Sequence, residues 1–158
     1  MRALLMAVGL VATPGLAQSA HPPLAQAGAL IGPALHVADL DRALRFYVDG
    51  LGMTNSLQMG SAEHRETILT FAGDPRSAGI ILLSGKASDR VVKHGSGYDR
   101  TVIRMPDLDS ARARLITAGF AAEPIRDVAK GYRMMMATDA DGYRFELVQS
   151  GTVGGKAR

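Results

Sequence analysis

Two stretches of this chain repeat one pattern, and this internal repeat is the strongest constraint on what the chain can fold into. Residues 39–53 begin Asp-Leu-Asp-Arg-Ala-Leu and end Leu-Gly-Met, while residues 107–120 begin Asp-Leu-Asp-Ser-Ala and end Ala-Gly-Phe. Such a repeat indicates one supersecondary unit used twice. Because two facing units enclose a cleft, we expect the functional site to lie between them.

Each copy of the repeat reads as an amphipathic helix with its own start and stop signals. Asp39 and Asp107 are suited to cap the helix N-termini, and Gly52 and Gly119 are suited to end the helices. Between these residues the apolar side chains recur at helical spacing. We therefore expect a helix of about three turns in each unit.

Strand-like runs flank both helices. We expect strands at 31–37, 55–59, 67–72 and 79–83 in the first unit, and at 100–105, 133–138 and 143–148 in the second. Turn residues separate these runs, so each unit has the order β-α-β-β-β. The expected fold class is α+β, with two βαβββ modules (about 30–85 and 98–149) forming a curved mixed sheet around a concave cleft.

Alternation along the expected strands separates their side chains into two faces. The apolar sets, such as Ile103 with Met105 and Phe145 with Leu147, should pack on the helices. The charged sets, together with His36, should line the opposite, concave face; they comprise Arg100, Arg104, Arg144 and Glu146.

The two ends of the chain differ from the rest in composition. Residues 1–17 combine a positive start, an apolar run and small residues at 15–17, which is typical of a secretory signal peptide. We therefore expect a periplasmic or secreted protein, with a flexible leader at 18–29 and a disordered tail at 150–158. Once the signal is removed, we expect no membrane association.

Composition excludes several classes of function. A length of 158 residues with 47% hydrophobic content suits one domain with a substantial core. The chain has no cysteine, so disulfides and thiol nucleophiles are excluded. The net charge of +3 is spread along the chain and forms no basic stripe, so nucleic acid is not expected as a partner.

Two parts of the sequence together resemble the vicinal oxygen chelate superfamily. They are the helix openings, with Phe46-Tyr47 and Leu51-Gly52, and the sequence Asp-Ala-Asp-Gly-Tyr-Arg-Phe-Glu-Leu at 139–147. That superfamily includes glyoxalase I, bleomycin-resistance proteins and extradiol dioxygenases. The resemblance covers residues 31–149. It implies the two-module fold, a small-molecule ligand in the cleft and a homodimer.

The resemblance also implies where a metal would bind, on the first and last strands of each unit. The corresponding positions here are Gly32, Leu82, Arg100 and Glu146, of which only Glu146 can coordinate a divalent cation. We therefore expect no standard metal site and no other cofactor, with Arg100 pairing with Glu146 in the vacated position. The alternative is a nonstandard divalent metal site that draws on His36, His64, His94 and Glu146.

The same resemblance suggests roles for individual side chains. His36 takes the place of a glutathione-binding arginine of glyoxalase I, so it is a candidate carboxylate contact or general base. Arg100 and Glu146 complete the expected catalytic set. The expected substrate contacts are of three kinds: basic side chains that could bind an anionic group, a hydroxyl at the entrance of the cleft, and an apolar wall. The residues are Arg104, Arg144 and His64 for the first, Tyr98 for the second and Met135 for the third.

Two functions follow, and the sequence does not choose between them. The first is a glyoxalase-like lyase or isomerase that works without the usual metal, with His36 as base and Arg100 or Arg104 stabilising an anion. The second is a non-catalytic small-molecule binding protein of the bleomycin-resistance kind. A metal-dependent lactoylglutathione lyase or dioxygenase ranks third because the expected ligands are missing.

Overall fold

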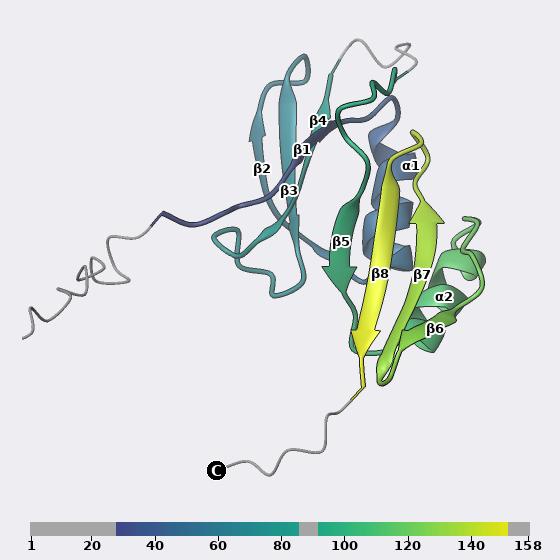
Figure 1. Ribbon diagram of the computed structural model, residues 1–158. Coiled ribbons are helices and arrows are strands. Elements are labelled where there is room, and N and C mark those ends of the chain that lie inside the picture. Colours follow the sequence, from purple (N-terminus) through teal and green to yellow (C-terminus); the bar gives the residue numbers. More distant parts are fainter. Residues whose placement is uncertain (1–27, 86–91, 152–158) are drawn as a thin grey trace, which may run out of the picture.

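The computed structural model describes residues 28–85 and 92–151 (Figure 1). The expected signal peptide lies outside the described residues, as do nearly all of the expected leader and tail. In the part of the chain that the structure describes, no helix is long and apolar enough to span a membrane.

The first module is a four-stranded sheet with one helical segment. Its strands are arranged in the order β1-β4-β3-β2, with β1 parallel to β4 and the other pairs antiparallel. The elements are β1 (Ala34–His36), α1 (Leu40–Leu44), η2 (Arg45–Gly50), β2 (Thr54–Gly60), β3 (Arg65–Thr70) and β4 (Gly79–Ser84).

The second module repeats this topology, with strand order β5-β8-β7-β6 and β5 parallel to β8. Its elements are β5 (Thr101–Arg104), α2 (Leu108–Thr117), β6 (Arg126–Ala129), β7 (Tyr132–Thr138) and β8 (Arg144–Ser150). The prediction of two βαβββ modules is therefore confirmed. The sequence pattern missed β6, because this edge strand is exposed along its whole length and carries no apolar alternation.

Both predicted N-caps are present, but the first helix is not α-helical throughout. The Asp39 carboxylate accepts the backbone N–H of Arg42, and the Asp107 carboxylate accepts those of Asp109 and Ser110. After Leu44 the first helix widens into the π-helix η2, which spans 45–50. The wider turn buries three of its six residues: Phe46, Tyr47 and Gly50.

One hydrophobic core joins the two modules, because the helix of the first module packs on the sheet of the second (Figure 1). The ring of Phe145 in β8 lies 5.5 Å from that of Phe46 and 5.6 Å from that of Tyr47. Phe120, which follows α2, lies 5.1 Å from Phe46 in an edge-to-face contact. Buried aromatic rings therefore fix the position of one module on the other.

Alternation divides the residues of β5 and β8 as predicted, and the strands of the first sheet show the same division into two faces. Ile103, Met105, Phe145 and Leu147 are buried against the helices. We call the opposite side the open face. It carries Ala34, His36, Leu57, Met59, Glu66, Ile68, Ile81 and Leu83 in the first module, and Val102, Arg104, Met134, Met136, Glu146 and Val148 in the second.

Two expectations about faces were wrong. Met135, expected among the substrate contacts, is fully buried in the core. It lies opposite Leu147 in the β7–β8 register, so it faces the helices, while Met134 and Met136 share the open face. Leu82, expected at a vacated ligand position, is likewise fully buried in the core.

Candidate functional site

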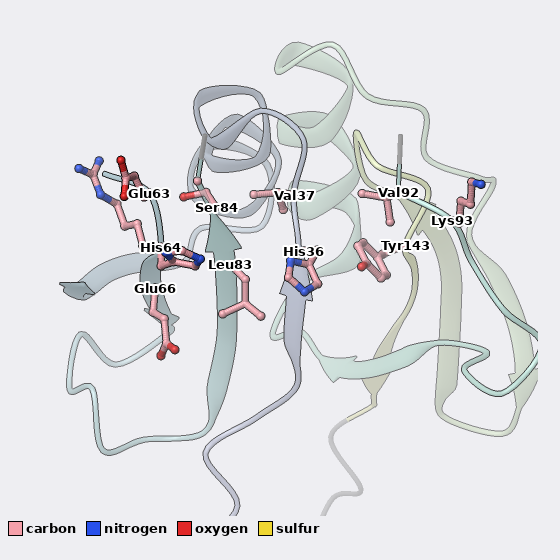
Figure 2. Close-up of a pocket in the computed structure, with 12 residues that line it drawn as sticks. His36, Val37, Glu63, His64, Glu66, Leu83, Ser84, Val92, Lys93 and Tyr143 are labelled. Carbon is pink, nitrogen blue, oxygen red and sulfur yellow. The ribbon is translucent and has the colours of Figure 1, made fainter. Parts of the chain in front are cut away.

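A pocket of ≈ 470 Å³ opens at the end of the first sheet, where strands β1, β3 and β4 meet the second module. Figure 2 shows His36 and Tyr143 next to each other, with the His64 imidazole pointing towards His36 across Leu83. This pocket brings together residues of both modules. Its lining consists of His36, Val37, residues 63–66 and 83–85, Val92, Lys93 and Tyr143.

The turn between β7 and β8 holds Tyr143 against β1. The Asp139 carboxylate oxygen Oδ1 accepts the backbone N–H groups of Asp141 at 2.9 Å and of Tyr143 at 2.8 Å, which fixes the turn. Asp141 in turn accepts the backbone N–H of Ala38, two residues after His36, at 3.1 Å. The two modules are thus hydrogen-bonded together next to the pocket.

Beneath this turn lies a buried polar pair. The Tyr47 hydroxyl donates to Asp139 Oδ2 at 2.6 Å, with 0% of Tyr47 and 6% of Asp139 exposed. Burial raises the pKa of both groups, and the neighbouring carboxylate raises that of Tyr47 further. Burial also raises the pKa of Tyr143, which keeps its hydroxyl protonated and able to donate in the pocket.

His94 holds the segment that leads into the second module against the turn between β7 and β8. Its Nε2 atom lies 2.7 Å from the backbone oxygen of Asp141, and its ring lies 4.7 Å from the ring of Tyr143 in an edge-to-face contact. A carbonyl oxygen only accepts, so Nε2 carries the proton. His94 therefore supports the pocket wall from outside, and its imidazole is not among the residues that line the pocket.

The expected ion pair between Arg100 and Glu146 is present. Arg100 Nε donates to Glu146 Oε2 at 2.5 Å, and its Nη1 donates to Asp99. Arg144 donates to the other oxygen of Asp99 at 3.3 Å. The hydrogen bond to Glu146, followed by that to Asp99, raises the pKa of Arg100. The two carboxylates, Asp99 and Glu146, balance the charges of the two guanidinium groups. Arg100 is not among the residues that line the pocket.

The strand register corrects the set of positions that correspond to metal ligands. In the second module Arg104 lies opposite Val148, and in the first module His36 lies opposite Leu83. Because His36 and Arg104 are equivalent in the repeat, the counterpart of Glu146 is Ile81, two residues before Leu83. The expectation of Leu82 was wrong by one residue, which in a strand reverses the face.

The corrected positions do not fit a divalent metal. Gly32 has no side-chain donor, Ile81 is apolar, and Arg100 is a cation that already donates to Glu146. Within residues 28–85 and 92–151, no group of three or more His, Asp or Glu side chains is placed to hold a metal ion.

The remaining predicted residues are divided between different parts of the fold. His36 and His64 share the pocket, whereas Arg104 lies exposed at the far end of β5. Tyr98 hydrogen bonds to Thr101, and its ring lies 6.2 Å from that of Tyr143, so it packs beside the pocket wall without lining the pocket.

Of the residues that line the pocket, sequence reasoning had named only His36 and His64 as site residues; Tyr143, Arg65, Glu66 and Lys93 are among those it missed. Alternation assigned Tyr143 to the core; its partly buried ring does pack against the core, but the residue lies in the turn before β8 and also lines the pocket. Arg65 and Glu66 begin β3, and the pattern placed the start of that strand at residue 67. The signal that could have identified these residues is their place next to a loop at the end of a strand, where binding residues often lie.

Comparison with known proteins identifies relatives in sequence and in fold. The chain is 30% identical over 120 residues to a lactoylglutathione lyase of Haemophilus influenzae, covering 73% of this chain and 88% of the relative. The trypanothione-dependent glyoxalase I of Leishmania major has a similar fold, with a TM-score of 0.66, 22% identity and coverage of 78% and 87%. So does the fosfomycin-resistance protein FosX of Listeria monocytogenes, with a TM-score of 0.59, 20% identity and coverage of 80% and 96%.

The sequence profile of one family matches residues 30–147, which span both modules and every pocket residue. The chain belongs to the Glyoxalase/Bleomycin resistance protein/Dioxygenase superfamily.

Proposed function

We propose that this protein is a metal-independent member of the superfamily, which takes a small anionic or partly apolar molecule into the His36 pocket. We further propose that it acts there as a lyase or isomerase, with His36 as the proton acceptor. The observation that carries the proposal is the ion pair between Arg100 and Glu146 at the corresponding metal position.

The charge arrangement at that position supports chemistry without a metal. Glu146 is the one carboxylate among the four positions, and only 19% of its side chain is exposed. Its Oε2 atom accepts from the Arg100 guanidinium. A divalent cation would have to displace this guanidinium and then find its other ligands elsewhere. The ion pair therefore meets the charge requirement of Glu146 that a metal meets in metal-binding relatives.

The pocket offers groups suited to proton transfer. Histidine is the side chain that most often takes or gives a proton in catalysis, and the His36 imidazole is exposed on the open face within the pocket. If His36 takes a proton from a carbon next to a carbonyl, the negative charge develops on the carbonyl oxygen. Tyr143 lines the same pocket with a protonated hydroxyl that can donate to that oxygen.

This assignment revises the expected anion-stabilising group. Neither Arg100 nor Arg104 lines the pocket. Arg100 is engaged by two carboxylates, and Arg104 lies at the far end of β5. Tyr143 is the better candidate because it lies next to His36 (Figure 2).

A non-catalytic binding protein is the second candidate function. Exposed apolar side chains on the open face favour it, since they provide a surface for a larger, partly apolar molecule. Leu57 is 39% exposed, Met59 45% and Val102 57%.

Turnover by metal-stripped protein tests the proposal. The first substrate to test is the hemithioacetal of methylglyoxal and glutathione, because one relative is named a lactoylglutathione lyase. A panel of small 2-oxo acids and aldehydes follows. We expect turnover without metal that falls at least about 100-fold in His36→Gln, which keeps a hydrogen-bonding side chain but removes the base.

Two results would contradict the catalytic proposal. Activity that appears only after Ni²⁺ or Zn²⁺ is added would show that the protein depends on a metal. Equal turnover in the wild type and His36→Gln would exclude His36 as the base. Ligand binding that persists in His36→Gln, with no turnover by either protein across the panel, would establish the binding function instead.

A further inference from the structure

We propose that Arg65 anchors an oxyanion group, a carboxylate or a phosphate, of the molecule that occupies the pocket. This inference rests on the proposed function because it concerns the same pocket. It goes further by naming Arg65 as a binding residue and an oxyanion as the ligand group that Arg65 binds. Arg65 lines the pocket at His36 and also a second hollow at the start of α1, so its side chain lies where the two meet.

Arg65 differs from the other described arginines in how it is placed. Most of them donate to a carboxylate or a backbone carbonyl oxygen; these are Arg76, Arg100, Arg112, Arg114, Arg126, Arg133 and Arg144. Within the described part of the chain, Arg42, Arg45, Arg65 and Arg104 make no side-chain hydrogen bond or ion pair. Of these four, Arg65 alone is partly buried.

Arg65 is partly buried, and its guanidinium has no acceptor among the described residues, so its donors are available to a ligand. Its five donors form a planar fork that matches a carboxylate or a phosphate. An oxyanion in the pocket would satisfy these donors. Such bonds are charge-assisted and stronger than those between neutral groups.

The backbone at Arg65 gives the guanidinium a rigid base. Arg65 is the first residue of β3 and lies between Gly60 of β2 and Ser84 of β4 in the sheet register. The preceding turn is also closely packed, since a Cβ atom at Gly60 would come within 2.1 Å of the backbone oxygen of His64. The backbone is therefore already ordered before a ligand binds, and only the side chain of Arg65 has to be ordered on binding.

The carboxylates around Arg65 define what kind of ligand would be accepted. Glu63 and Glu66 line the pocket, and Asp39 and Asp41 line the second hollow. Among the described residues, none of these carboxylates forms an ion pair with Arg65. The negative charge of these carboxylates repels an anion that does not touch Arg65. Anion binding should therefore depend on direct hydrogen bonds to the Arg65 guanidinium. His36, His64 and Lys93 add possible donors within the pocket.

Anion binding to the full chain, followed by NMR, tests the inference. Acetate and inorganic phosphate serve as probes, each titrated at constant ionic strength with chloride as the balancing anion. The Nε–H signal of Arg65 is expected to shift and saturate. The affinity reported by the backbone amides of residues 63–66 should fall about tenfold in Arg65→Gln and less in Arg65→Lys, which keeps the charge but loses the fork.

Arg45→Gln is the matched control, because Arg45 is exposed, has no ion-pair partner among the described residues and lines neither hollow. Unchanged anion affinity in Arg65→Gln, or an equal loss in Arg45→Gln, would overturn the inference. Tighter binding of acetate or of phosphate identifies which oxyanion the site prefers. The measurement needs no turnover, so Arg65 can be the anion site even if His36 proves not to be a base, and the two failures can be told apart.

Discussion

Removing the Tyr47 hydroxyl is the sharpest test of how the two modules are held together. Tyr47→Phe keeps the buried ring and its 5.6 Å contact with Phe145, but removes the donor that lies 2.6 Å from Asp139 Oδ2. Asp139 Oδ1 would keep its two backbone donors. One oxygen of a carboxylate that is 6% exposed would then lack a partner.

The expected cost follows from that geometry. Hydrogen bonds to charged groups contribute about 1.5–3 kcal/mol, and a buried acceptor left without a donor retains its desolvation penalty. We therefore expect Tyr47→Phe to lower the free energy of unfolding by about 2 kcal/mol. For a domain of this size, the Tm should fall by about 8 °C.

Chemical denaturation and thermal melting of the full chain measure this effect. The matched control is Tyr132→Phe, because Tyr132 is 45% exposed and a surface substitution should change stability by less than about 0.5 kcal/mol. A double-mutant cycle of Tyr47→Phe with Asp139→Asn isolates the pair and should give a coupling of about 1–2 kcal/mol. A loss below about 0.5 kcal/mol in Tyr47→Phe, or no coupling, would refute the reasoning.

Two further perturbations test the fold. Burial raises the pKa of Asp139 above its ordinary value, so the folded state holds this proton more tightly than the unfolded state. The stability that comes from this proton is present below the ordinary pKa of an aspartate and is lost as the pH rises through the pKa of Asp139 in the folded state. Urea unfolding across the acidic range should therefore show a free energy of unfolding that depends less on pH in Asp139→Asn than in the wild type. Gly50→Ala should destabilise by about 1–3 kcal/mol, because the new Cβ would lie 2.7 Å from Leu115 Cδ2 in the core. Gly95→Ala, with nothing within 4 Å of the new Cβ, is the neutral control, and equal melting temperatures of the two alanine variants would contradict the close packing of η2 on α2.

Local signals in the sequence were sufficient where a short stretch of chain decides the outcome. The caps at Asp39 and Asp107 depend on donors two or three residues away, so they could be identified from the repeat. The buried faces of β5 and β8 follow from a period of two residues. The pairing of Arg100 with Glu146 is not local, since the two residues are 46 positions apart; it was expected from the family resemblance, which left one carboxylate among the four metal positions.

The errors share a different cause. Met135 and Leu82 were placed on the wrong face because a strand position is defined by its partners, and a shift of one residue reverses it. Strand β6 was missed because an exposed edge strand has no apolar alternation. The π-turn at 45–50 packs on α2, where Leu115 would lie 2.7 Å from a Cβ at Gly50, so its surroundings come from a distant part of the chain.

The sequence by itself therefore determined the modules, their order and the family, because repeats, caps and strand periodicity are encoded by neighbouring residues. Only the tertiary structure decided what forms the pocket. His36, Arg65, Lys93 and Tyr143 come from separate segments, and they meet because the helix of one module packs on the sheet of the other. The Asp139 turn then fastens the second module to the end of β1. No local pattern carries that information, since these contacts join residues far apart in the chain.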